Sequence, residues 1–158
     1  MTATDWHLRP LRSDDHEPAA ALIRSAFGAL SVAADPPPSA LRETAAGIAA
    51  MDGGAVAVAA DGTLAGVVLW AERDGGLYVG RLAVAPSWRR CGIARALVAA
   101  AEAEARGRRL PRVHLGTRLV LAGNRRLFAA CGFVETGQRA AHAGYDHPTV
   151  VDMEKRLA

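Results

Sequence analysis

Three apolar runs in the middle of the chain are separated by short segments that favour tight turns. The runs span residues 55–60, 64–71 and 77–85, and the segments between them are Asp61-Gly62 and Arg73-Asp74-Gly75-Gly76. Asp-Gly and Gly-Gly favour hairpin turns because these turns need positive φ angles. The sequence therefore predicts an antiparallel meander of three strands at the centre of the fold.

A helix follows the third of these strands almost directly. Pro86 ends the strand, and over residues 92–106 the apolar period changes from two residues to 3.6. Ile93 and Leu97 fall on one side of this helix, whereas Arg95 falls on the other. Such an amphipathic helix packs on a sheet, so we expect it to cross over to a further strand at residues 112–120, with His114 and Arg118 on one face of it.

The flanking segments add further strands and helices. We expect a strand at residues 6–11, another that begins at residues 133–135 and a last one at residues 150–153. Asp14 and Glu17 have the spacing of a capping box that opens a helix. Ser39, which follows three consecutive prolines, is placed to cap a second helix reaching Ile48. A shorter helix before Gly132 turns Phe128 inward.

Length and composition describe one ordinary globular domain. At 158 residues, with 51% hydrophobic and 22% charged residues, the chain can bury a core, and we expect a single domain over residues 1–158. Cys91 and Cys131 lack the spacing of a metal site and fit a reduced compartment. With no apolar stretch of about 20 residues and no signal-peptide core, we expect no membrane segment and a cytoplasmic location. Only 5% of residues are aromatic and no reader motif is present, so nucleic acid is not an expected partner.

The most informative stretch is Arg89-Arg90-Cys91-Gly92-Ile93-Ala94, at the junction of the third strand and the helix. A helix start exposes unpaired N–H groups and the positive end of the helix dipole, which together bind phosphate. Gly92 and Ala94 are small where a pyrophosphate would approach the backbone. The flanking strands are joined by hairpins, so a Rossmann dinucleotide site is excluded, and the Gly-Lys-Ser/Thr of a P-loop is absent from the stretch.

These residues resemble the signature of the Gcn5-related, coenzyme A-dependent N-acetyltransferases. That signature is Arg or Gln, two residues, Gly, one residue, then Gly or Ala, and the chain reads Arg89-x-x-Gly92-x-Ala94. It follows a strand ending in Leu82-Ala83-Val84-Ala85-Pro86, and the downstream segment 127–133 resembles the family's second motif, which ends in Gly-Phe. The order of elements matches as well, so the resemblance covers essentially the whole chain.

The resemblance implies a fold and a cofactor. The fold is the acyl-CoA N-acyltransferase fold of the α/β (α+β) class, a mixed, mainly antiparallel sheet of about six or seven strands flanked by about four helices. Acetyl-CoA is the implied co-substrate, with its pantetheine arm between the strand ending at Val84 and the strand from Val113. Backbone groups of Leu82, Ala83 and Val84 would pair with that arm, and an N–H near Val84 would polarise the thioester carbonyl. Arg89 and Arg90 would lie near the pyrophosphate.

Two positions, one in the second motif and one just before it, depart from the family pattern. Phe128 stands where many relatives have a tyrosine that protonates the leaving thiolate, and it is predicted to pack in the core. Asn124 lies three residues after the usual position of the family's asparagine, which Leu121 takes. Asn124 either contacts the pantetheine or, after Gly123, caps a helix.

The catalytic base is displaced from its usual family position, because no carboxylate occurs between Leu77 and Val84. Glu72 on the preceding strand and His142 in the loop 140–149 are the remaining candidates. His142 has an ordinary pKa suited to neutral pH, and Tyr145 in the same loop could supply the acid. The alternative interpretation of Glu72 is an ordinary charge at a hairpin end.

The function implied by the resemblance is acetyl transfer from acetyl-CoA to a primary amine by direct attack in a ternary complex. The acceptor is a small molecule or a protein amine, no metal is required, and a homodimer is compatible with this interpretation. A non-catalytic acyl-CoA binding or regulatory module is the alternative, since the strand carboxylate and the tyrosine are both missing.

Overall fold

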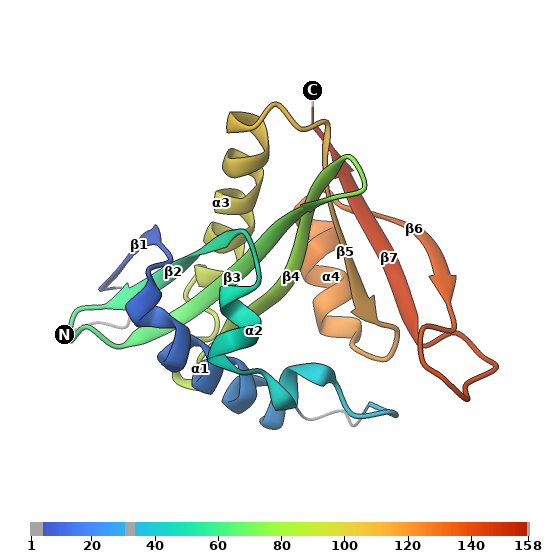
Figure 1. Cartoon of the computed structure of the whole chain (residues 1–158), viewed down its shortest axis with the longest axis horizontal. Coiled ribbons are helices and arrows are strands. Elements are labelled where there is room, and N and C mark those ends of the chain that lie inside the picture. The colour runs from blue at the N-terminus through green and yellow to red at the C-terminus, as the bar shows by residue number, and fades with distance from the viewer. Residues whose placement is uncertain (1–4, 31–33, 158) are drawn as a thin grey trace.

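The computed structural model describes residues 5–30 and 34–157, which form a seven-stranded sheet with four α-helices and three short 3-10 helices (Figure 1). The elements in chain order are β1 (Trp6–Pro10), η1 (Ser13–Asp15), α1 (His16–Gly28), η2 (Ser39–Arg42), α2 (Ala45–Ala49), β2 (Gly53–Ala59), β3 (Leu64–Arg73), β4 (Gly76–Val84), η3 (Pro86–Trp88), α3 (Ile93–Gly107), β5 (Arg112–Arg118), α4 (Ala122–Ala130), β6 (Val134–Arg139) and β7 (Val150–Arg156). No helix in the described ranges is long and apolar enough to cross a membrane.

The sheet has the order β1-β2-β3-β4-β5-β7-β6, and the pairing of β4 with β5 is its parallel pairing. The pairs β1/β2, β2/β3, β3/β4, β5/β7 and β6/β7 are antiparallel. The predicted meander is β2–β3–β4, and α3 is the predicted crossover to β5. The expected fold class and the mainly antiparallel sheet are confirmed.

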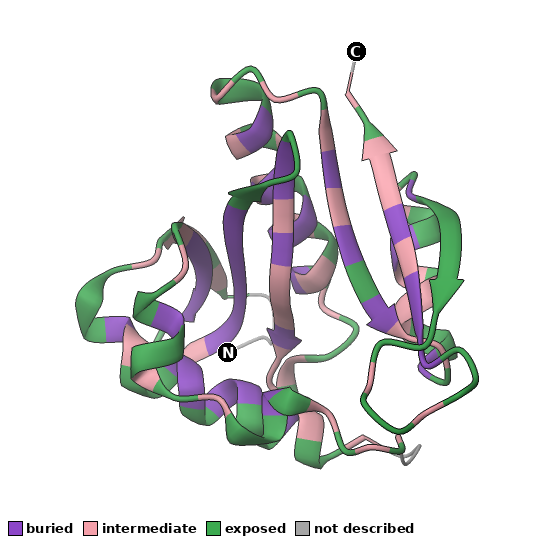
Figure 2. Cartoon of the chain, turned by 45° about the vertical axis from the view of Figure 1, so that its right-hand side comes forward, coloured by how far each residue is buried: buried purple, intermediate pink, exposed green. Residues whose placement is uncertain are grey.

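Helices cover both faces of the sheet (Figure 1). On one face α3 and α4 bury a core that includes Leu77, Leu97 and Phe128. On the other face α1 and α2 cover β2, β3 and the end of β4, where Ile23 and Leu69 are buried. Strand β3 is buried along most of its length, whereas β6 at the sheet edge is exposed throughout (Figure 2).

Strands β4 and β5 begin side by side and then separate. Their pairing consists of Leu77 with Val113 and Tyr78 with His114. A β-bulge in β4 at Gly80 shifts the β3/β4 register, so that Leu69 pairs with Arg81 and Trp70 with Val79. Bulges bend the strand that carries them. The rest of β4 therefore diverges from β5, as the sequence resemblance implied (Figure 2).

Two predicted helix starts differ from the structure. The capping box is formed by Arg12 and Asp15 instead of Asp14 and Glu17: the Arg12 N–H donates to Asp15 Oδ2 at 2.8 Å. Arg9 also donates to both carboxylate oxygens of Asp15, at 2.7 and 3.0 Å, which fixes that side chain at the helix entrance.

The single helix predicted from Ser39 to Ile48 is instead two short helices, η2 and α2. Glu43 between them is extended, with φ −60° and ψ 143°. Its carboxylate accepts a hydrogen bond from Arg81 Nε at 3.0 Å and another from the Thr44 N–H at 3.1 Å. Thr44 then caps α2 through its side chain, which accepts from the Gly47 N–H at 3.1 Å. The contact with β4 therefore interrupts the helix.

Candidate functional site

Three cavities follow one another along the divergence of β4 and β5. The inter-strand cavity, of about 220 Å³, lies between the two strands. The middle cavity, of about 260 Å³, is bounded by α1, the end of β4 and α4. The helix-start cavity, of about 200 Å³, lies at the first turn of α3. The first two share Leu82 and Asn124 in their walls, and the last two share Val84 and Ala94, so the three form one continuous slot.

The loop between β4 and α3 brings small residues and backbone N–H groups to one end of the slot. Gly92 is the N-cap of α3 with φ 81°, and Arg90 also has a positive φ of 64°. The N–H groups of the first helical turn have no partner within the helix, and the positive end of its dipole lies there. Gly92, Ile93 and Ala94 line the helix-start cavity. This end of the slot is suited to an anionic group such as phosphate.

Arg89, Arg90 and Cys91 take different positions around this end. Arg90 lines the helix-start cavity and Arg89 lines the middle cavity. Arg89 Nη2 also donates to the Ala26 carbonyl at 3.3 Å, which links the loop to α1. Cys91 is half-buried and packs against the core, outside the walls of the three cavities. The two arginines, and not the cysteine, are placed to meet an anion.

The diverging end of β4 offers unpaired backbone groups to the slot. The Ala85 N–H donates to Ala65 of β3 at 2.8 Å, and Ala83 pairs with Val67. Because backbone groups of successive strand residues alternate in direction, those of Leu82 and Val84 point to the opposite edge. That edge faces β5, which has already separated from it. An extended ligand can therefore hydrogen-bond to β4 like an added strand.

Helix α4 forms the other wall of the slot. Asn124 lies within its first turn and lines two of the cavities; the N-cap is Leu121, so the predicted capping role of Asn124 is wrong. Phe128 lines the inter-strand cavity and is 5% exposed. Its ring packs edge-to-face on Phe133 with centroids 5.7 Å apart. Phe128 is thus both core and wall.

His142 lies in the wall of the inter-strand cavity. Its Nδ1 is 2.7 Å from the hydroxyl of the buried Thr149, which holds the ring in place. The pKa of His142 lies below its ordinary value, because partial burial disfavours the cation and because Arg118 and Arg139 are nearby. The lowered pKa favours the neutral imidazole, which can accept a proton at Nε2 if Nδ1 carries the hydrogen bonded to Thr149.

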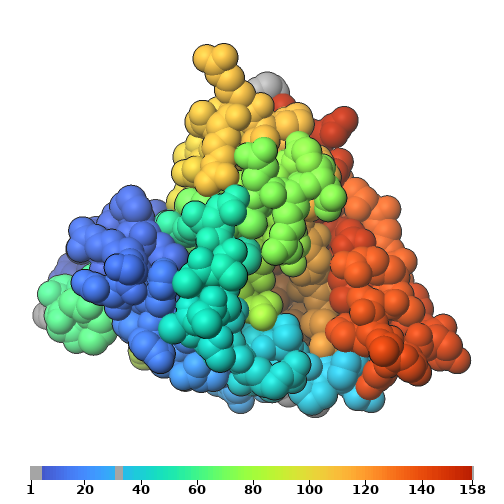
Figure 3. Space-filling view, in the orientation of Figure 1, coloured from blue at the N-terminus to red at the C-terminus, as the bar shows by residue number. Residues whose placement is uncertain are grey.

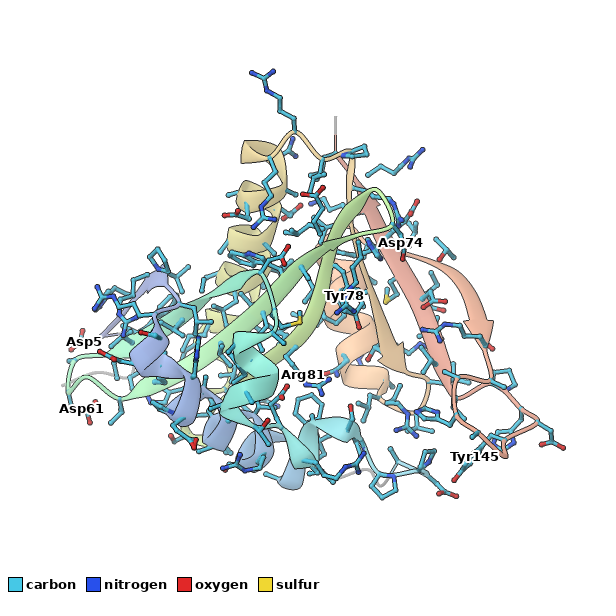
Figure 4. All side chains as sticks on the ribbon, in the orientation of Figure 1. Asp5, Asp61, Asp74, Tyr78, Arg81 and Tyr145 are labelled. Carbon is cyan, nitrogen blue, oxygen red and sulfur yellow. The ribbon has the colours of Figure 1, made fainter. Side chains whose placement is uncertain are left out.

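Tyr145 and Glu72 lie outside the slot. The Tyr145 hydroxyl donates to Asp35 Oδ1, which raises the pKa of the phenol, and Figure 4 shows the side chain reaching from the β6–β7 loop towards the segment before η2. Glu72 is exposed on β3, outside the walls of the three cavities, with Oε1 3.8 Å from Arg108 Nη1. Of the three predicted catalytic side chains, the structure brings only His142 to the slot.

Three arginines that the sequence reasoning did not select line the inter-strand cavity. They are Arg81 of β4, Arg118 of β5 and Arg139 of β6. In the space-filling view this surface is hollowed between the β3–β4 hairpin and the β6–β7 segment (Figure 3). Tyr78 and Arg81 lie on the β4 side of this hollow (Figure 4). Strand alternation had placed His114 and Arg118 on one face, which was the available signal for Arg118.

Metal ligands are not gathered at this site. In the part of the chain that the structure describes, no three His, Cys, Asp or Glu side chains come together as a potential metal site. The slot instead combines a phosphate-type helix start, an open strand edge and a basic, partly apolar cavity.

Comparison with solved structures identifies the same architecture in acetyltransferases. Nourseothricin acetyltransferase superposes with a TM-score of 0.75 at 25% identity, covering 99% of this chain and 100% of that one. The ribosomal-protein-S18-alanine N-acetyltransferase of Escherichia coli gives 0.74 at 19% identity, with 97% and 94% covered. A protein from Bacillus anthracis in complex with acetyl coenzyme A gives 0.62 at 17% identity, with 68% and 63% covered.

The sequence itself matches a family profile. No protein of curated function matches the chain in sequence. The profile of the acetyltransferase (GNAT) family matches residues 14–133, which include β4, the helix start of α3 and α4. The chain therefore belongs to the GNAT family and is an acetyl-CoA-dependent N-acetyltransferase.

Proposed function

We propose that acetyl-CoA lies along the slot, with its pyrophosphate at the helix start of α3 and its acetyl end at the inter-strand cavity. The observation that carries this assignment is the continuity of the three cavities, which share Leu82, Asn124, Val84 and Ala94 in their walls. A charged binding end and a reaction end are thereby joined by an extended channel along β4.

The chain's own groups would hold the cofactor in three ways. The first-turn N–H groups of α3, with Arg89 and Arg90, meet the phosphates. Backbone groups of Leu82 and Val84 pair with the pantetheine arm, and the Leu82 N–H, in the wall of the inter-strand cavity, is the donor for the thioester carbonyl. Ala83, Ala94, Asn124 and Phe128 shape the channel through their positions in its walls.

We propose that the acceptor amine enters through the inter-strand cavity. Its nitrogen forms a bond to the acetyl carbonyl carbon, the carbon–sulfur bond breaks, and the sulfur leaves as a thiolate. The nitrogen also loses a proton, which His142 Nε2 accepts directly or through water. The leaving thiolate needs no strong acid, since a thiol of pKa about 8.5 costs only about 2 kcal/mol to ionise at pH 7.

The role of Tyr145 follows from its contact with Asp35. This hydrogen bond ties the β6–β7 loop to the segment leading into η2, and both segments contribute to the wall of the inter-strand cavity through His142 and Ser39. We therefore propose that Tyr145 positions the cavity wall. The alternative is that Tyr145 protonates the leaving thiolate, and the kinetics of Tyr145→Phe distinguish the two roles. Glu72 has no role in this proposal.

The remaining features of the proposal are coarser. One domain over residues 1–158 fits the single sheet, which includes the first strand of the chain, β1, and the last, β7. A cytoplasmic location fits the two free cysteines, Cys91 and Cys131. A homodimer is compatible with the exposed edge strand β6, where Val134 is 61% exposed. The likeness to nourseothricin acetyltransferase puts an antibiotic amine among the acceptors to be tested.

The test is acetyl-CoA binding by calorimetry together with release of free thiol across a panel of primary amines. Ala94→Leu places bulk in the wall shared by two cavities and is expected to abolish binding. Ala99→Leu makes the same change on the exposed side of α3 and is expected to bind normally. Unchanged affinity in a folded Ala94→Leu variant would show that the cofactor lies elsewhere.

A further inference from the structure

The inter-strand cavity has a one-sided charge. Three guanidinium groups and the imidazole of His142 stand in its wall, and no Asp or Glu does. The other polar side chains there, such as Ser39, Thr117 and Asn124, are neutral. A cavity lined in this way attracts an anion and disfavours a cation.

Two of the three arginines are already neutralised by carboxylates outside the cavity wall. Arg81 Nε lies 3.0 Å from Glu43 Oε1, and its Nη2 donates to the Ser39 hydroxyl at 3.1 Å. Arg139 Nε lies 2.9 Å from Asp152 Oδ2. These pairs fix the two guanidinium groups in position in the cavity wall.

Arg118 differs from both. Within residues 5–30 and 34–157 its side chain makes no ion pair within 4 Å, and its Nε is fully buried without a hydrogen-bond partner. With no carboxylate to neutralise it, this guanidinium keeps its charge, and its planar set of donors fits a carboxylate or phosphonate. The position therefore has the chemistry of an incomplete anion site.

We propose that the acceptor of this enzyme is a small primary amine that also carries an anionic group, a carboxylate or a phosphonate, and that Arg118 with Arg139 binds this group. The inference rests on the proposed function, because it takes the inter-strand cavity to be the acceptor site. The shared chemistry is an oxyanion a few bonds from the reacting nitrogen.

The same charges suit the reaction. Nearby cations disfavour the ammonium form of the acceptor and so lower the pKa of its amine, which increases the fraction able to attack. A carboxylate in the wall would do the opposite. The anionic group then supplies the attraction that a cationic amine alone would not find in this cavity.

The size of the cavity supports a small acceptor. Its volume of about 220 Å³ is below the usual range for small-molecule sites, about 300–1,000 Å³. Because the acetyl group must also fit, the room left for the acceptor is smaller still. Tyr78 stands in its wall on the side where β4 and β5 are paired. An amino acid or an aminophosphonate fits such a space better than a large polycation does.

The experiment compares matched amines on the whole protein with saturating acetyl-CoA. Glycine, β-alanine and 4-aminobutyrate are each tested against their amides, aminomethylphosphonate against methylamine, and spermidine and an aminoglycoside serve as cationic amines. Rates are expressed as kcat/KM for the neutral amine. We expect at least one anionic amine to exceed its neutral counterpart by about tenfold or more, the effect of a hydrogen-bonded charge pair.

Arg118→Gln is the decisive variant, and Arg106→Gln on the exposed end of α3 is its matched control. We expect Arg118→Gln to remove the preference for the anionic amine while the Kd for acetyl-CoA stays unchanged, and Arg106→Gln to change neither. Carboxylate and phosphonate arms identify which oxyanion is bound.

Three outcomes overturn the inference. Faster turnover of the amides or of the cationic amines does so while leaving the cofactor site intact. A preference for anionic amines that survives in a folded Arg118→Gln variant assigns the charge recognition to other residues. Binding of acetyl-CoA without turnover of any amine overturns the inference and the proposed acceptor site together. The cofactor site is tested separately, by acetyl-CoA binding to Ala94→Leu.

Discussion

Gly116 of β5 and Arg139 of β6 are in contact across the intervening strand β7: a Cβ on Gly116 would lie 3.4 Å from Arg139 Nη2. It would also lie 3.3 Å from Asp152 Oδ1, the partner of Arg139. The absence of a side chain at Gly116 therefore leaves room beside it for the Arg139–Asp152 pair, and both Gly116 and Arg139 stand in the wall of the inter-strand cavity.

Replacement of this glycine tests whether the arginine matters to the acceptor. In Gly116→Val the added methyl groups displace the Arg139 side chain and narrow the cavity. We expect kcat/KM for the acceptor to fall by about tenfold or more, as misplaced substrate contacts do, while the Kd for acetyl-CoA is retained. Gly137→Val on β6 is the control, since a Cβ there meets nothing within 4 Å. Equal loss in both variants would point to a general effect on the sheet.

The bond between Tyr145 and Asp35 allows the positioning role to be separated from an acid role. Tyr145→Phe and Asp35→Asn each weaken the tie between the two cavity segments. We expect both to raise KM for the acceptor about three- to tenfold, the effect of one hydrogen bond, with kcat nearly unchanged. If Tyr145 protonated the thiolate, Tyr145→Phe would instead lower kcat about tenfold and Asp35→Asn would not.

The local signals in the sequence predicted most of the fold. Asp61-Gly62 and the turn 73–76 form the hairpins between β2, β3 and β4, and the change of period after Gly92 is the start of α3. The break between η2 and α2 could not be predicted, because it depends on a hydrogen bond that Arg81 donates to Glu43, 38 residues away. Long-range contacts of this kind leave no local pattern.

The cofactor end of the slot was predictable from sequence, and the acceptor end was not. Gly92 and Ala94 belong to a motif whose spacing is set by the helix start. Arg139, by contrast, lies on an edge strand that is exposed throughout and so has no alternation of apolar and polar residues. Residues 133–135 indicate only where that strand begins, and nothing in the local pattern shows that it extends to Arg139. The charge of the cavity becomes visible only when β5, β6 and β7 are placed side by side.

The Arg9–Asp15 pair makes a prediction about stability. Arg9 hydrogen bonds lower the pKa of the Asp15 carboxyl, helped by the Arg12 N–H. The stabilisation is therefore present at neutral pH and is lost as the pH falls through the acid range and the carboxylate is protonated. Asp15→Asn is expected to lower the free energy of unfolding by about 1.5–3 kcal/mol at pH 7, measured by urea denaturation.

The control for this pair is Asp14→Asn, which changes an exposed neighbouring carboxylate and should have little effect. The difference between wild type and Asp15→Asn should shrink below about pH 4, where the carboxylate of the unfolded chain takes up a proton while that of the folded protein is still charged. A difference that is constant from pH 7 to pH 3 would mean that packing, and not the ion pair, supplies the stability.

The last prediction concerns the pH dependence of turnover. The pKa of His142 lies below its ordinary value of about 6.5, first because of burial and then because of Arg118 and Arg139. If His142 is the base, kcat falls as the pH falls through this lowered pKa, because the imidazolium cannot accept a proton. Arg118→Gln removes one of the two nearby cations, so the pKa of His142 rises and the acid limb of the kcat profile moves to higher pH.

Two further variants serve as controls for this shift. Arg106→Gln makes the same change of charge outside the cavity and should leave the acid limb in place. His142→Gln should abolish the acid limb. An acid limb that remains in His142→Gln would assign the proton to water or to another group, whatever the arginine variant shows.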